Sequence, residues 1–174
     1  MPKPHKYKAV ALVGVAALAW IATRKSDAAD GLIYEVGEKI GMTTRGLRNN
    51  NPGNIERNNI AWNGMSSDQS ADSRYVVFDA PEYGIRAMGR VLNTYYTIHT
   101  LQTVRGIIGR WSPPSENQTE SYINHVAQRL DISPDTPINW TIENRVKLVA
   151  AIIKHENGVQ PYSTEFIRQS VLMP

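Results

Sequence analysis

ENRVKLVAAIIKHENG, residues 143 to 158, carries apolar side chains at helical spacing over most of its surface. Val146, Val149 and Ile153 recur at intervals of three and four residues, and Ile152 widens the apolar stripe. A helix with so broad an apolar face is buried in a folded domain. We therefore expect this helix to lie almost wholly in the core.

The same helix ends on an acidic residue. Gly158 is the residue type that ends a helix in the left-handed conformation, so Glu156 falls in the last turn. The backbone carbonyls there carry partial negative charge, which disfavours an ionised carboxylate. A carboxylic acid that keeps its proton is what a glycosidic oxygen needs as a proton donor. A charged residue at a helix end is also common on ordinary surfaces, so the pattern leaves both interpretations open.

The composition excludes several kinds of site. The chain has no cysteine, and its four histidines are scattered without ligand spacing, so we expect neither a metal nor a cofactor. The net charge of +3 arises within the first 30 residues, because residues 31 to 174 carry equal numbers of basic and acidic side chains. The predicted domain therefore lacks the basic surface of a nucleic-acid-binding protein.

An uncharged run, AVALVGVAALAWIAT, occupies residues 9 to 23 between basic flanks. It is shorter than the roughly 20 residues of a typical spanning helix, but snorkelling of Lys8 and Arg24 can extend it. We predict a transmembrane helix over residues 7–25, with residues 1–30 as membrane anchor and linker. A secretory signal peptide and an amphipathic or buried helix are the alternatives.

The remaining chain predicts a loop, a hairpin and a series of helices. Residues 45–54, RGLRNNNPGN, consist largely of turn formers and predict a loop. The run around Trp62 and the run 75–78 predict a small antiparallel hairpin with a polar connection. Helical patterns follow, with Asp79-x-x-Glu82 as an expected capping box, and with Thr103 and Thr119 as further expected caps.

Several segments resemble motifs of the lysozyme-like lytic transglycosylases, in particular those found as phage structural or lysis proteins. AIIKHENGVQPYS, residues 151–163, is similar to the family's catalytic helix, and NQTESYINHV, residues 117–126, is similar to its E-T-x-x-Y-V helix. NNNPGNI, residues 49–55, followed by W-x-G, resembles the phage branch. The acid-bearing helix comes last here, so the resemblance requires a circularly permuted domain. Asn157 replaces the usual serine, and the family's G-L-M-Q motif has no clear counterpart.

The resemblance implies a mainly α fold of the α+β lysozyme-like class, with a helical lobe and a small β-hairpin lobe over residues 31–174. It also implies cleavage of the β-1,4 bond between N-acetylmuramic acid and N-acetylglucosamine, with Glu156 as the single catalytic residue. The candidate sugar contacts are amides and aromatic rings: Asn51, Asn54, Trp62, Tyr122 and Tyr162. Ordinary structural roles are the equal alternative, since core packing also explains the patterns around Trp62 and Tyr122.

Other carboxylates compete for a catalytic role. A glucosaminidase-like pattern nominates Glu35 or Glu38, and Glu116 and Glu120 are further candidates at a helix start. A hydrolytic muramidase needs a second carboxylate, for which the hairpin region offers Asp68, Asp72 and Asp79. A non-enzymatic virion protein that binds peptidoglycan is the remaining alternative.

The expected partners follow from these predictions. They are bacterial peptidoglycan, a lipid membrane bound through residues 7–25, and other virion membrane proteins, with no nucleic acid among them. We expect a single-pass protein in a phage virion membrane or in the host inner membrane, with the catalytic domain facing the periplasm.

Overall fold

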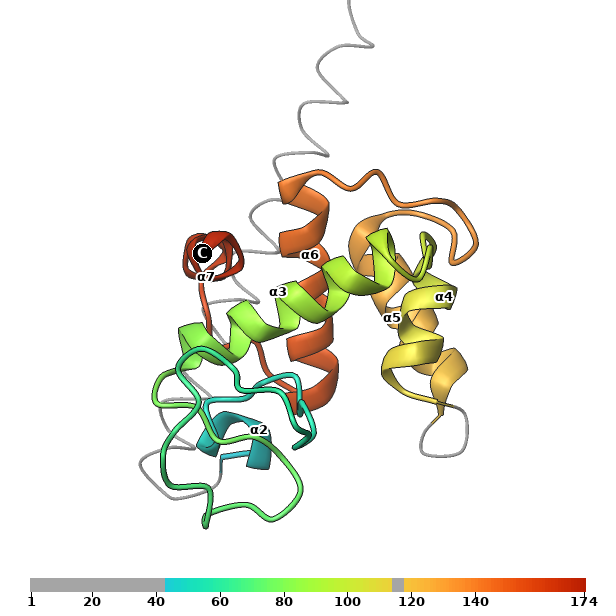
Figure 1. Ribbon diagram of the computed structural model, residues 1–174. Helices are drawn as coiled ribbons and strands as arrows, with labels where there is room; N and C mark the ends of the chain where they lie inside the picture. Colours follow the sequence, from blue (N-terminus) through green and yellow to red (C-terminus); the bar gives the residue numbers. More distant parts are fainter. Residues whose placement is uncertain (1–42, 114–117) are drawn as a thin grey trace, which may run out of the picture.

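The computed structural model of the chain describes residues 43–113 and 118–174. Within these ranges the chain forms a set of α-helices that pack around one apolar core (Figure 1). The helices are α2 (Arg45–Arg48), α3 (Pro81–Thr97), α4 (Val104–Trp111), α5 (Thr119–Leu130), α6 (Ile142–Asn157) and α7 (Thr164–Leu172).

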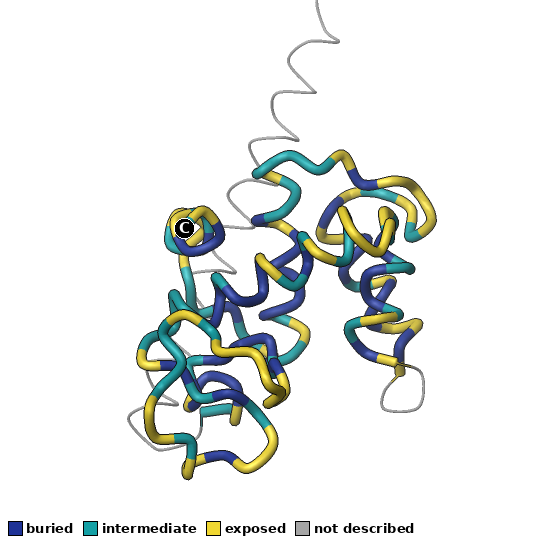
Figure 2. The backbone as a smooth tube through the Cα atoms, viewed as in Figure 1, coloured by how far each residue is buried: buried dark blue, intermediate teal, exposed yellow. Residues whose placement is uncertain are grey.

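Helix α6 is the predicted core helix, and its bounds agree closely with the sequence pattern. Thr141 begins it by accepting a hydrogen bond from the Asn144 amide, and Gly158 ends it with a φ of 71°. The predicted apolar residues, including Val149 and Ile152, are buried (Figure 2). Helix α6 packs against α5 on one side and α7 on another, while α3 packs mainly against α7.

The predicted helix caps are only partly right. Thr103 caps α4, since its side chain accepts a hydrogen bond from the Gly106 amide. The predicted capping box at the start of α3 is wrong, because the N-cap is Ala80 and no side chain caps this end. Thr119 lies inside α5 rather than capping it, and its hydroxyl donates to the Ser112 carbonyl instead.

Residues 43–80, called here the loop lobe, do not contain the predicted β-hairpin. Only isolated bridges connect its two arms, Glu56 with Tyr75 and Met65 with Phe78, and no strand forms in the described ranges. Side-chain amides take the place of a ladder: Asn51 donates to the Ile55 and Val76 carbonyls. The fold class is therefore helical rather than α+β, and the prediction of a hairpin lobe is wrong.

The expected loop over residues 45–54 is also partly wrong, because its first turn is helix α2. The Asn-rich remainder, from Asn49 to Asn54, is irregular as predicted. Asn50 and Asn54 adopt left-handed φ values of 53° and 50°, a conformation that asparagine tolerates better than most residues.

The prediction of a single-pass membrane protein is not retained. Across residues 43–113 and 118–174, no helix has both the length and the apolar character needed to cross a bilayer. The run 7–25 lies outside the described residues, and so does the predicted domain boundary at residue 30.

Candidate functional site

Glu156 lies in the last turn of α6, half-buried, with a hydrogen bond to each carboxylate oxygen. The Tyr122 hydroxyl, from α5, donates to Oε1 over 2.9 Å. The Asn54 side-chain amide, from the loop lobe, donates to Oε2 over 2.9 Å. Both donors are uncharged, so the carboxylate is held in place without an ion pair. Three segments that are far apart in the sequence therefore converge on one acidic group.

Glu156 also lines a cavity of about 680 Å³. The other walls come from the loop lobe, from the second half of α3 and from the end of α4. Among the described residues, aromatic side chains form much of this wall, and they are Trp62, Tyr75, Tyr95 and Trp111. Aromatic faces of this kind can stack on the apolar faces of sugar rings, as they do on other flat apolar surfaces.

The position of Asn54 is fixed by contacts between the loop lobe and α6. The Asn157 side-chain amide donates to the Pro52 carbonyl over 2.7 Å, and the Thr44 hydroxyl donates to Asn157 Oδ1 over 2.6 Å. A Cβ atom on Gly46 would lie 2.8 Å from Asn54 Oδ1, so only glycine allows this close approach. Asn157 thus ties the loop lobe to the helix that carries Glu156.

Tyr122 is buried, and its ring stacks on the His155 imidazole with a centroid distance of 3.6 Å. Burial raises the pKa of the Tyr122 phenol well above its usual value, and the negative charge of Glu156 raises it further. Tyr122 is therefore a protonated hydrogen-bond donor throughout the physiological pH range.

His155 is itself in contact with a second imidazole, that of His125, at a centroid distance of 5.4 Å. Burial lowers the pKa of both histidines, and the proximity of His155 lowers that of His125 further. Both rings are therefore mostly neutral near pH 7. In the described ranges, no three histidine or carboxylate side chains gather closely enough to hold a metal ion.

The structure separates the predicted sugar contacts into two groups. Asn54 and Trp62 line the cavity. Tyr122 does not line it, but its hydroxyl donates a hydrogen bond to Glu156, which does. Asn51 is fully buried, and its side-chain amide is used to bind the backbone of the loop lobe. Tyr162 does not line the cavity, and its ring stacks on Phe166 of α7.

The competing carboxylates do not join Glu156. Asp72 is buried and ion-paired with Arg45 at 2.6 Å, and neither Asp68 nor Asp79 lines the cavity. Glu120 forms an ion pair with Arg105 on the outer surface of α5. The other three candidates, Glu35, Glu38 and Glu116, lie outside the described residues.

Sequence reasoning missed several residues of the cavity. Glu56 is its second carboxylate among the described residues, and it is ion-paired with Arg74 at 2.6 Å. Tyr95 and Arg110 come from the ends of α3 and α4. Each belongs to an ordinary amphipathic or surface pattern, so no local signal marks it as part of a site.

Comparison with known proteins places the chain in a family. No protein-family model matches it. The chain is 38% identical over 134 residues to Protein P5 of Pseudoalteromonas phage PM2, an alignment that covers 75% of this chain and 82% of the phage protein. Identity of this extent shows common descent and a common fold. The chain therefore belongs to the family of Protein P5 of phage PM2.

Proposed function

We propose that this protein is a phage-encoded, virion-associated enzyme that cleaves the glycan strands of bacterial peptidoglycan, with Glu156 as its catalytic acid. The observation that carries the proposal is the Glu156 carboxyl, which lines a cavity with aromatic walls and is held by Asn54 and Tyr122. Membership in a phage protein family supports the phage origin.

The two hydrogen bonds suit a group that gives up and regains a proton. The Tyr122 hydroxyl can donate to the carboxylate and can accept from the carboxylic acid, because a hydroxyl has both capacities. The Asn54 amide fixes the other oxygen in both states. Such fixation keeps the acid oriented toward the scissile bond, and accurate orientation is a large part of catalytic power.

The reaction needs only this one carboxyl group. Glu156 donates its proton to the oxygen that leaves C1 of the muramyl residue, and the C1–O bond breaks as positive charge develops on the sugar ring. The resulting carboxylate then removes a proton from the C6 hydroxyl of the same residue. The C6 oxygen attacks C1 and closes a 1,6-anhydro ring, so Glu156 regains its proton and no water is consumed.

Glu56 makes hydrolysis the second candidate. It lines the same cavity, and a carboxylate across the bond could activate water in an inverting or retaining reaction. Its carboxylate is engaged by Arg74 through two nitrogens, Nη2 at 2.6 Å and Nε at 2.8 Å. We favour the single-carboxylate reaction because both contacts hold Oε1 of Glu56 on the Arg74 guanidinium, whereas Glu156 forms no ion pair among the described residues.

The test compares Glu156→Gln with Glu120→Gln in a clearing assay on purified cell wall. The first variant keeps the shape of the side chain but cannot donate a proton, so we expect at least about a 100-fold loss of clearing. The second variant alters a carboxylate outside the cavity and is expected to clear at the wild-type rate.

Undiminished clearing by Glu156→Gln would remove Glu156 from the mechanism. Absence of clearing by the wild-type protein, combined with retention of the protein on the wall, would instead favour a binding protein without turnover.

A further inference from the structure

Arg110 is a charged residue of the cavity that the proposed reaction does not use. Glu56 and Arg74 neutralise one another, and Glu156 is held by uncharged donors. Among the described residues, no carboxylate forms an ion pair with Arg110. Arg90 also lines the cavity, but its guanidinium donates to the Met173 carbonyl over 2.9 Å. Within residues 43–113 and 118–174, Arg110 therefore supplies a positive charge at the cavity wall that no ion pair neutralises.

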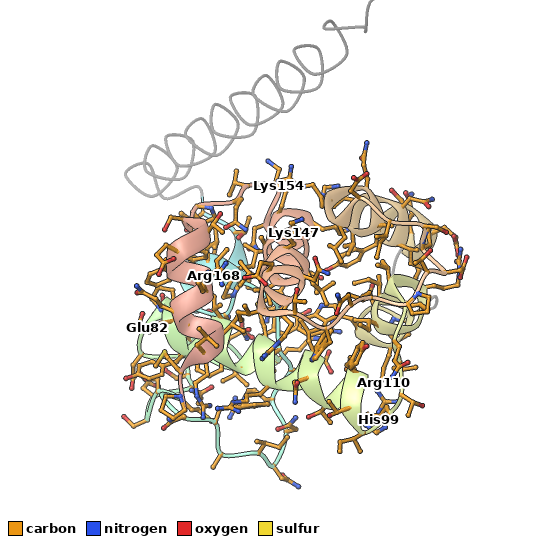
Figure 3. The ribbon with its side chains drawn as sticks, turned by 90° about the horizontal axis from the view of Figure 1, so that it is seen from above. Glu82, His99, Arg110, Lys147, Lys154 and Arg168 are labelled. Carbon is orange, nitrogen blue, oxygen red and sulfur yellow. The ribbon has the colours of Figure 1, made fainter. Side chains whose placement is uncertain are left out.

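A cation–π contact with the Tyr95 ring orients the Arg110 side chain. Its guanidinium carbon lies 5.2 Å from the centroid of the Tyr95 ring, which packs edge-on against both Trp111 and His99. Figure 3 places Arg110 and His99 together where α3 ends beside α4. Stacking uses the face of a guanidinium and leaves the N–H groups at its edge free. Those N–H groups match the two oxygens of a carboxylate.

We propose that Arg110 binds a free carboxylate on the lactyl-peptide substituent of the glycan and so makes the enzyme selective for strands that carry free carboxylates. This inference rests on the proposed function. The sugar rings of such a glycan are uncharged, whereas each muramyl residue carries a carboxylate either on its own lactyl group or on the peptide attached there. A cationic group in the wall of a cavity that holds sugar rings thus distinguishes strands with free carboxylates from strands whose carboxylates are amidated.

The test uses two forms of one substrate that differ only in charge. Purified peptidoglycan is first N-acetylated to block its amines, and half is then converted with carbodiimide and ammonia so that carboxylates become neutral carboxamides. The ratio of kcat/KM for the carboxylate form to that for the carboxamide form is measured for the full-length wild-type protein, Arg110→Gln and Arg110→Lys. Arg129→Gln, which removes a positive charge from the exposed face of α5, is the matched control.

We expect the wild-type protein and the control to prefer the carboxylate form by roughly 10-fold, the effect of one charge-assisted hydrogen-bonded contact. In Arg110→Gln this ratio falls to about one, and in Arg110→Lys it is intermediate, because a lysine retains the charge but not the two-pronged geometry. A wild-type ratio near one, or an unchanged ratio in Arg110→Gln, would overturn the assignment.

A binding measurement separates this inference from the proposed function. Glu156→Gln, with and without Arg110→Gln, is sedimented with each form of the insoluble wall, and the bound fraction is measured. If the wild-type protein cleaves neither form, the proposed function fails, whereas the ratio of bound fractions still decides the role of Arg110. A ratio that Arg110→Gln leaves unchanged contradicts that role.

Discussion

The contact between Tyr122 and Glu156 joins the core of the protein to its cavity. The Tyr122 ring is almost completely buried between α5 and α6, while its hydroxyl holds a carboxyl group that lines the cavity. The stacked His155 ring restricts rotation of the phenol. An acid held in this way has fewer unproductive orientations than one on a free side chain, which is an entropic advantage for proton transfer.

Replacement of Tyr122 by Phe tests this advantage. The variant keeps the ring and its stacking on His155 but loses the hydrogen bond to Glu156, so we expect kcat on peptidoglycan to fall roughly 10- to 100-fold. Tyr96→Phe is the matched control, because it removes a hydroxyl that binds the Ile138 carbonyl outside the cavity. Equal rates in the two variants would show that the Tyr122 hydroxyl does not position the acid.

Asp72 gives a second prediction for a single residue, this time about stability. The Arg45 guanidinium holds the pKa of the Asp72 carboxyl far below its usual range, and the Tyr75 amide, the Asn49 side chain and the Arg74 amide also lower it. A depressed pKa in the folded state stabilises the protein above the unfolded value of about 3.9, and this contribution is lost as the pH falls below it.

The free energy of unfolding should therefore decline as the pH falls below about 4, and this decline should be smaller in Asp72→Asn. Urea titrations at a series of pH values measure both slopes. Asp79→Asn, at an exposed carboxylate, serves as the control and should keep the wild-type slope. An Asp72→Asn protein with the wild-type slope would contradict the assignment.

At the scale of the elements, Gly84 tests how α3 meets the loop lobe. A Cβ atom on Gly84 would lie 2.0 Å from the Asn50 backbone carbonyl oxygen, so Gly84→Ala must push the loop lobe away from α3. We expect a loss of about 1–3 kcal/mol in unfolding free energy, together with lower activity, because the displaced loop carries Asn54.

Gly109→Ala is the matched control for this change. Nothing lies within 4 Å of a Cβ atom at this position of α4, and alanine favours the helical conformation. The control should be more stable than the wild-type protein by about 0.5–1 kcal/mol. Urea titrations of both variants give the comparison, and similar effects from the two substitutions would contradict the close packing at Gly84.

The longer helices could be predicted from the sequence because their signals are local, whereas the sequence predicts a loop at the single turn of α2. Apolar spacing defines the buried face of α6, and Gly158 marks its end. The structure of the loop lobe could not be predicted, because its arms pair only at isolated bridges and side-chain amides bind much of the remaining backbone. Gln69 accepts from the Val77 amide and donates to the Val77 carbonyl, which uses the groups that a hairpin ladder needs. The β-prone residues near Tyr75 do not indicate that a side chain will take the place of these ladder hydrogen bonds.

At the scale of the whole molecule, the site depends on contacts between distant parts of the chain. Glu156, Asn54 and Tyr122 could be nominated because each occurs in a motif with its own pattern. Arg110 and Glu56 could not, because membership of a cavity depends on how α3, α4 and the loop lobe pack. Asn51 is a predicted sugar contact, but its side-chain amide binds only the backbone of the loop lobe and so stabilises that loop.

The family relationship allows these assignments to be tested in a second protein. Protein P5 of phage PM2 shares 38% identity over 134 residues with this chain, so the two proteins share their core. Matched variants at aligned positions of the two proteins can then be compared residue by residue. Glu156 is the first residue to compare, because the proposed reaction depends on this one carboxyl group.

Mass spectrometry of the fragments released from purified peptidoglycan tests the proposed role of Glu156. We predict that the wild-type protein releases fragments ending in 1,6-anhydro-muramyl residues, which are lighter by one water than hydrolysis products, and that Glu156→Gln releases none. Release of the same fragments by Glu156→Gln, or of reducing ends alone by the wild-type protein, would contradict a reaction carried by Glu156 as its single carboxyl group.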